Sequence, residues 1–162
     1  MNKKIFILIL VVIIALCLIM PITSTQDFDG NFTMEVPFGS HYSNVAWCRA
    51  NGALGCADEY WEENAGCDLD ENEMVVYYYD DSLLGDGESN VLQYAVDDLT
   101  YTYLYEIHND DENSLVLKTD YSMHNTPTYL VGKVNGDASK VVFVGGHNLD
   151  DLIHYANTIK FR

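Results

Sequence analysis

The chain has 162 residues, of which 25 are acidic and 8 are basic, so its formal net charge is −17 at pH 7. This length predicts a single domain. A field this acidic repels nucleic acid and anionic lipid, so we expect no nucleic-acid partner and a preference for cations or basic proteins. Hydrophobic residues make up 48% of the sequence, which excludes a disordered acidic tail.

An uncharged apolar run, "IFILILVVIIALCLIM", occupies residues 5–20, with two lysines before it and a proline after it. As a helix rising about 1.5 Å per residue, it spans about 24 Å, close to the roughly 30 Å of a bilayer core. The pattern favours a retained signal anchor within residues 1–25, with the lysines in the cytoplasm. Two alternatives stay open: a signal peptide cleaved at "TST" (23–25), which would make the protein secreted, and a buried core helix.

Residues 26–162 carry all the acidic side chains, and we expect them to form an α+β ectodomain outside the cell membrane. Near its start, "NFTMEVP" (31–37) alternates apolar and polar residues, which predicts a half-buried strand that ends at Pro37. The same stretch contains the sequon "NFT", so Asn31 is a candidate for N-glycosylation.

Two acidic stretches, "DFDGN" (27–31) and "DLDEN" (68–72), each place three oxygen ligands on alternate residues. A calcium-binding EF-hand loop also needs glycine at its sixth position and glutamate at its twelfth. Neither stretch has these residues, so we expect no specific metal site and no cofactor. Diffuse binding of divalent cations is the alternative that this charge leaves open.

Residues 38–73 predict a loop, with room for a short strand near "SNVAWC" (43–48). Within this loop, residues 47–67 hold three of the four cysteines, in the pattern C-x7-C-x10-C. Zinc sites favour pairs two to four residues apart, and acidic neighbours disfavour a reactive thiolate. Because an exported chain permits disulfides, we expect one disulfide here and one cysteine left over. The disulfide candidates are Cys48, Cys56 and Cys67, and Trp47 and Trp61 are candidates to cover the bridge or to contact a partner.

The middle of the chain predicts a strand at 73–80, "EMVVYYYD", followed by a turn. Residues 90–107 fit two structures, since their apolar positions follow helical spacing while "LTYTYLY" also alternates like a strand. Length and a capping Ser89 favour the helix. The expected apolar face consists of Leu92, Val96, Leu99, Tyr103 and Ile107.

The C-terminal part predicts a strand at 113–120 and a hairpin, in which "NGDA" joins strands at 126–134 and 139–146. A final helix begins after Asn148 as N-cap, with Asp151 in the capping-box position. A phosphate-binding reading of "VGGHNLDD" is disfavoured because two aspartates already occupy the first helical turn. The expected apolar stripe of this helix is Leu149, Leu152, Ile153 and Ala156.

This order of elements predicts an α+β fold, with two helices packed on an antiparallel sheet in an α/β/α-like sandwich. "FTMEVPFGS" near the start and "TYLVGKVNGDASKVVFVGGHNLDDLIHYANTIKF" at the end resemble the PsbP-like fold group, and within it small secreted or anchored archaeal proteins. The resemblance implies an accessory or binding domain and carries over no functional residue. The cysteine-rich stretch departs from it.

No catalytic pattern stands out, because the five histidines are scattered and form neither H-x3-H nor H-E-x-x-H. The 12 tyrosines suit either a strand that alternates core and surface or a face for sugar or protein recognition. We therefore expect a non-enzymatic cell-surface interaction module, held to the membrane by its N-terminal helix, with an envelope protein or glycan as partner. The alternatives are an envelope-directed enzyme and a surface domain that binds divalent cations.

Overall fold

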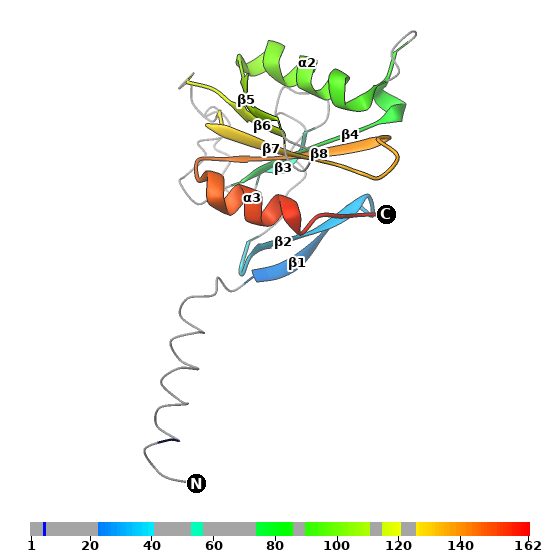
Figure 1. Ribbon diagram of the computed structural model, residues 1–162. Coiled ribbons are helices and arrows are strands. Elements are labelled where there is room, and N and C mark those ends of the chain that lie inside the picture. The colour runs from blue at the N-terminus through cyan, green and yellow to red at the C-terminus, as the bar shows by residue number, and fades with distance from the viewer. Residues whose placement is uncertain are drawn as a thin grey trace, which may run out of the picture.

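The computed structural model shows an α+β fold with two antiparallel sheets and two α-helices, which confirms the expected class. It describes residues 23–40, 53–56, 74–85, 90–110, 115–120 and 126–162, together with Ile5. Helix α2 (Val91–Tyr103) lies on one face of the larger sheet. Helix α3 (Leu149–Asn157) and the smaller sheet lie on the other face, so the described chain forms three layers (Figure 1).

The larger sheet has six strands in the order β3-β4-β8-β7-β6-β5, and every neighbouring pair is antiparallel. The strands predicted at 73–80 and 113–120 are confirmed, and so is the hairpin across "NGDA". Their β-branched and aromatic residues favour strands that are buried on both faces. The six strands are β3 (Ala53–Cys56), β4 (Val75–Asp80), β5 (Glu106–Asp110), β6 (Leu115–Lys118), β7 (Tyr129–Val134) and β8 (Lys140–Gly146).

Strand β3 lies where the sequence predicted a loop, so that expectation is wrong for residues 53–56. Alanine and glycine favour strands weakly. Pairing with β4 stabilises the strand that these residues favour only weakly. Its register places Ala53 opposite Tyr77 and Cys56 opposite Val75. The short strand expected near residues 43–48 lies outside the described residues.

The smaller sheet consists of β1 (Thr23–Phe28), β2 (Phe32–Pro37) and β9 (Lys160–Phe161), in the order β1-β2-β9. Strand β2 ends at Pro37, as predicted. The sequence analysis assigned no element to β1, which pairs with β2 along its whole length. A turn joins the two strands, with positive φ angles of 52° at Asp29 and 78° at Gly30. Asp-Gly is the usual sequence for such a turn, so part of "DFDGN" is a hairpin signal.

Helix α2 is shorter than expected, because the chain leaves it after Tyr103 and starts β5 at Glu106. Ile107 therefore lies on a strand, and its place on the helix face was wrong. The capping residue is Asn90 rather than Ser89, since the Asn90 side chain accepts a hydrogen bond from the N–H of Gln93 at 3.1 Å. The buried positions of the helix are Val91, Ala95 and Leu99, with Leu92 and Val96 partly buried beside them.

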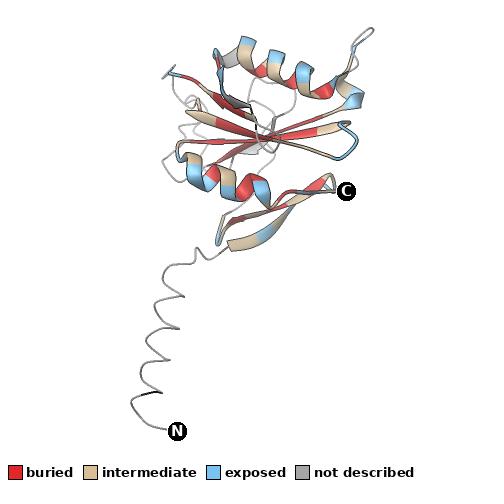
Figure 2. Ribbon diagram, viewed as in Figure 1, coloured by how far each residue is buried: buried red, intermediate tan, exposed pale blue. Residues whose placement is uncertain are grey.

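Helix α3 begins as predicted, with Asn148 accepting a hydrogen bond from the N–H of Asp151 at 3.5 Å. Leu152 and Ala156 are buried, and Tyr155, which the sequence analysis left out, is buried with them. Each helix is buried only along the side that faces the sheet, as Figure 2 shows. The large sheet thus separates an α2-side core from a core shared by α3 and the small sheet.

The predicted membrane segment lies outside the described residues except for Ile5, which is helical. Within the parts of the chain that the structure describes, no helix has the length and apolar character needed to cross a membrane. The disulfide prediction also falls outside them, since Cys48 and Cys67 are not described and Cys56 is placed only by its position in β3. Trp47 and Trp61 lie outside the described residues as well.

Candidate binding hollow at the end of helix α2

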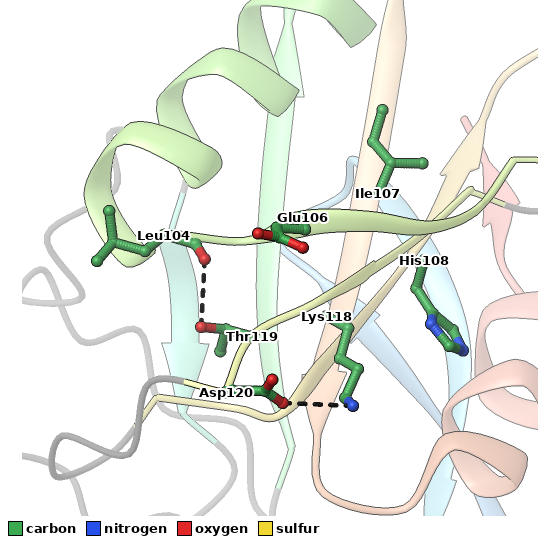
Figure 3. Close-up of a pocket in the computed structure, with 7 residues that line it drawn as sticks. All are labelled: Leu104, Glu106, Ile107, His108, Lys118, Thr119 and Asp120. Carbon is green, nitrogen blue, oxygen red and sulfur yellow. Dashed lines mark hydrogen bonds and ion pairs between the residues drawn. The ribbon is translucent and has the colours of Figure 1, made fainter.

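A hollow of about 480 Å³ opens where helix α2 ends and strand β5 begins, beside the end of β6 (Figure 3). Its walls come from the α2–β5 connection, from the first half of β5, and from the last residue of β6 with the two residues after it. The lining residues are Leu104, Glu106, Ile107, His108, Lys118, Thr119 and Asp120.

Leu104 joins α2 to β5 in a left-handed conformation, with φ 56° and ψ 39°. This backbone region costs a non-glycine residue about 1 kcal/mol or more, and glycine usually occupies the position. The Leu104 N–H closes the helix by donating to the carbonyl of Thr100 at 2.9 Å. The Thr119 hydroxyl donates to the Leu104 carbonyl at 3.3 Å, which ties the connection to the end of β6.

Large apolar side chains gather around this connection and remain in water. Tyr101 is 90% exposed, Leu104 62% and Ile107 60%. We call these three residues the exposed apolar cluster. Tyr101 lies on the last turn of α2, three residues before the Leu104 cap. Leu104 and Ile107 both line the hollow. Single exposed apolar residues are ordinary, but three of them within the seven residues from Tyr101 to Ile107 favour an interaction surface.

Charged groups surround the apolar walls. The Lys118 ammonium lies 3.3 Å from the nearer carboxylate oxygen of Asp120, in a pair whose side chains are 37% and 93% exposed. Lys118 also stands opposite Glu106 in the β5–β6 register. Exposed ion pairs of this kind contribute little stability and exchange easily. Two carboxylates against one ammonium leave the lining acidic at neutral pH, like the molecule as a whole.

Strand β5 is irregular at the hollow. The register with β6 shifts between Ile107 and Asn109, so His108 is the extra residue of a bulge. Bulges redirect a side chain and twist an edge strand, and they are frequent next to functional sites. The His108 ring lies 6.1 Å from the ring of Tyr129, with the planes tilted by 60°. Within the described part of the chain, β5 is the last strand of the large sheet.

The hollow is lined by one hydroxyl, two carboxylates and one imidazole, with one ammonium. The one hydroxyl among the lining residues belongs to Thr119, which is 5% exposed and bonds to the Leu104 carbonyl. No cluster of three or more histidine, cysteine, aspartate or glutamate residues suited to a metal occurs among the residues that the structure describes.

The candidates within "DFDGN" (27–31) lie around the β1–β2 turn, while "DLDEN" (68–72) lies outside the described residues. Asp27 accepts the Gly30 N–H at 2.8 Å and pairs with the Arg162 guanidinium at 2.7 Å. Its oxygens therefore hold the hairpin and the last residue together. Asn31, the glycosylation candidate, is half-buried in this turn, and its carbonyl accepts the Arg162 N–H at 3.0 Å.

None of the residues that line the hollow is among the site residues expected from the sequence. Ile107 was expected on the buried face of a longer helix, and this expectation concealed its exposure. A helix that ends at Tyr103 leaves Leu104 and Ile107 outside both the helical stripe and the core. Apolar residues that fit neither the helix nor the core, here Leu104 and Ile107, were the sign of a binding surface that the sequence offered.

Comparison with known proteins adds no relative. No protein-family model matches the chain, and neither curated proteins nor solved structures give a match.

Proposed function

We propose that the protein is a membrane-anchored, non-enzymatic interaction module that binds a protein partner through the hollow at the end of α2. The exposed apolar cluster is the observation that carries this proposal. Burying apolar surface gains about 25 cal/mol per Å². The cluster stays in water in the free protein, so a partner that covers it would gain this free energy on binding. The strained conformation of Leu104 keeps one of these side chains at the rim of the hollow.

The chemistry of the hollow favours a peptide segment with an apolar residue beside lysine or arginine. The apolar walls, Leu104 and Ile107, are aliphatic, whereas sugar recognition favours aromatic faces. Glu106 and Asp120 supply the acidic groups that would meet a basic side chain. A protein segment is therefore a better partner than a glycan.

The position of β1 supports a retained membrane anchor over a cleaved signal peptide. A cut after Thr25 would remove the first three residues of β1, which pair with the end of β2. It would also remove the Thr23 hydroxyl, which donates to the Glu35 carboxylate at 3.0 Å. The apolar run at residues 5–20 would then serve as the anchor, with the ectodomain outside the cell.

The layered arrangement supports the PsbP-like resemblance, because one antiparallel sheet lies between helices on its two faces. Strands β2 and β9 of the small sheet lie within the first and last stretches on which the resemblance rests. A PsbP-like domain would agree with an accessory or binding role, which is the role we propose.

The proposal can be tested with fluorescent peptides that carry leucine flanked by lysines, and with the same peptides carrying glutamate. We expect the full-length protein in detergent to bind only the lysine peptides. Ile107→Ser should weaken binding about tenfold, the equivalent of about 1.4 kcal/mol for a contacting aliphatic side chain. Phe38→Ser is the matched control, since Phe38 is also exposed but lies elsewhere. Equal affinity of Ile107→Ser and the unmodified protein would disprove the assignment of the site.

A further inference from the structure

A tight turn at the end of β2 holds a phenylalanine out in solvent. The Ser40 N–H donates to the Pro37 carbonyl at 3.1 Å, and Gly39 has a φ of 90°, which defines a turn with Phe38 at its second position. The Phe38 side chain is 72% exposed. Turn positions favour small or polar residues, so a large apolar side chain here calls for a contact outside the domain.

This turn lies next to the point where the chain would leave a membrane. Pro37 pairs with Thr23, the first residue of β1, and Figure 1 shows these two strand ends side by side. The apolar run ends at Met20, three residues before Thr23. Three Cα–Cα steps span at most about 11 Å, and paired antiparallel residues lie about 5 Å apart. Pro37 is therefore held within about 16 Å of Met20, whatever path the intervening chain takes.

We infer that the Pro37–Ser40 turn rests on the bilayer surface, with the Phe38 ring in the interfacial layer. The inference depends on the membrane anchor proposed above and adds a second contact to it. Amphipathic and aromatic groups concentrate at this depth of a membrane. The turn itself carries no charge, so it suits a zwitterionic surface, whereas the acidic domain would be repelled by an anionic one.

This contact would also set the orientation of the ectodomain. The turn belongs to the small sheet, and α2, whose end forms one wall of the hollow, covers the opposite face of the large sheet (Figure 1). With Phe38 at the membrane, the exposed apolar cluster faces the aqueous phase. The α2 side of the proposed binding site would then be accessible to partners that approach from outside.

The test uses the full-length protein in phosphatidylcholine vesicles, with photoreactive p-benzoylphenylalanine in place of Phe38. The matched control carries the same residue in place of Tyr101, which is aromatic and 90% exposed on the α2 side. After illumination, mass spectrometry should find lipid adducts at position 38 and only background at position 101. Thermal unfolding that matches the unmodified protein shows that both variants are folded.

Two outcomes would overturn the inference, and they differ in what they say about the anchor. Equal lipid labelling at the two positions, in protein that stays with the vesicles through an alkaline carbonate wash, would disprove the Phe38 contact and leave the anchor intact. Release of the protein by that wash would disprove the anchor and the contact together. Binding of lysine peptides at the hollow would stand in either case.

Discussion

At the residue scale, Leu104 has both a strained backbone conformation and an exposed side chain. Its left-handed conformation would suit glycine, and its side chain contributes to the wall of the hollow instead of the core. Leu104→Gly should raise the free energy of unfolding by about 1 kcal/mol, because glycine adopts this conformation without steric cost. Leu104→Ala is the control, since it removes the same side chain and keeps the strain, so its stability should stay within about 0.5 kcal/mol. Urea unfolding of the two variants gives the comparison, and equal stabilities would contradict the role of strain.

A single residue, Tyr78, should make the free energy of unfolding depend on pH. Burial raises its pKa to about 12, and the neighbouring Asp80 carboxylate adds to the shift. Because the neutral phenol is favoured in the folded state, its contribution is complete below pH 10 and is lost as the pH rises from 10 to about 12. We expect the free energy of unfolding to fall over this range, and to fall less in Tyr78→Phe. Urea titrations at several alkaline pH values measure the difference, and parallel curves for the two proteins would argue against it.

At the element scale, the ends of α2 decide where the hollow forms. The helix begins after the Asn90 cap and ends at Tyr103, and both ends differ from the sequence expectation. Asn90→Ala should lower the free energy of unfolding by about 1 kcal/mol, since it leaves a helix N–H without its acceptor. Ser89→Ala is the matched control and should change stability by less than about 0.5 kcal/mol. Thermal unfolding measures both variants. A larger loss of unfolding free energy in Ser89→Ala than in Asn90→Ala would show that Ser89 is the N-cap, as the sequence suggested.

The elements also show how far the sequence determines the fold. Strands β4 and β8 and helix α3 were predictable because β-branched runs, a cap and an apolar stripe agree with one another. The end of α2 was not, because its last residues fit a helix and a strand equally well and a leucine occupies the usual place of a stop glycine. Strands β1 and β3 were missed because polar or small residues form them, and pairing with a stronger neighbour supplies their order.

At the scale of the whole molecule, the cysteine-rich stretch is part of the connection between the two sheets. It follows β2 of the small sheet, contains β3 and precedes β4 of the large sheet. A disulfide here would shorten a connection that is long in the unfolded chain. Such a crosslink typically contributes about 2–4 kcal/mol to stability by restricting the unfolded state.

The corresponding prediction concerns thiol reactivity in the protein after the export that we propose. In a Cys17→Ser variant, which leaves three cysteines, alkylation under non-reducing, denaturing conditions should modify one thiol, and reduction should expose two more. Reduction should also lower the free energy of unfolding by about 3 kcal/mol. Mass spectrometry reports the count. Three alkylatable thiols without reduction would rule out the disulfide. One bound zinc per chain would support a zinc site instead, which the cysteine spacing disfavours.

The pairing of β9 with β2 has a consequence for how the protein is made. Phe161 and Lys160 complete the small sheet by joining Phe32 and Thr33, so residues from the two ends of the domain must meet. Contacts this distant in sequence slow folding, and under the proposed export they cannot form until β9 has been synthesised and has crossed the membrane. The β1–β2 hairpin can form early. Its aromatic residues, Phe28 and Phe32, stay exposed until α3 and β9 have folded against them. During that interval the emerging chain would need protection at the outer face of the membrane, either by the bilayer surface or by a chaperone.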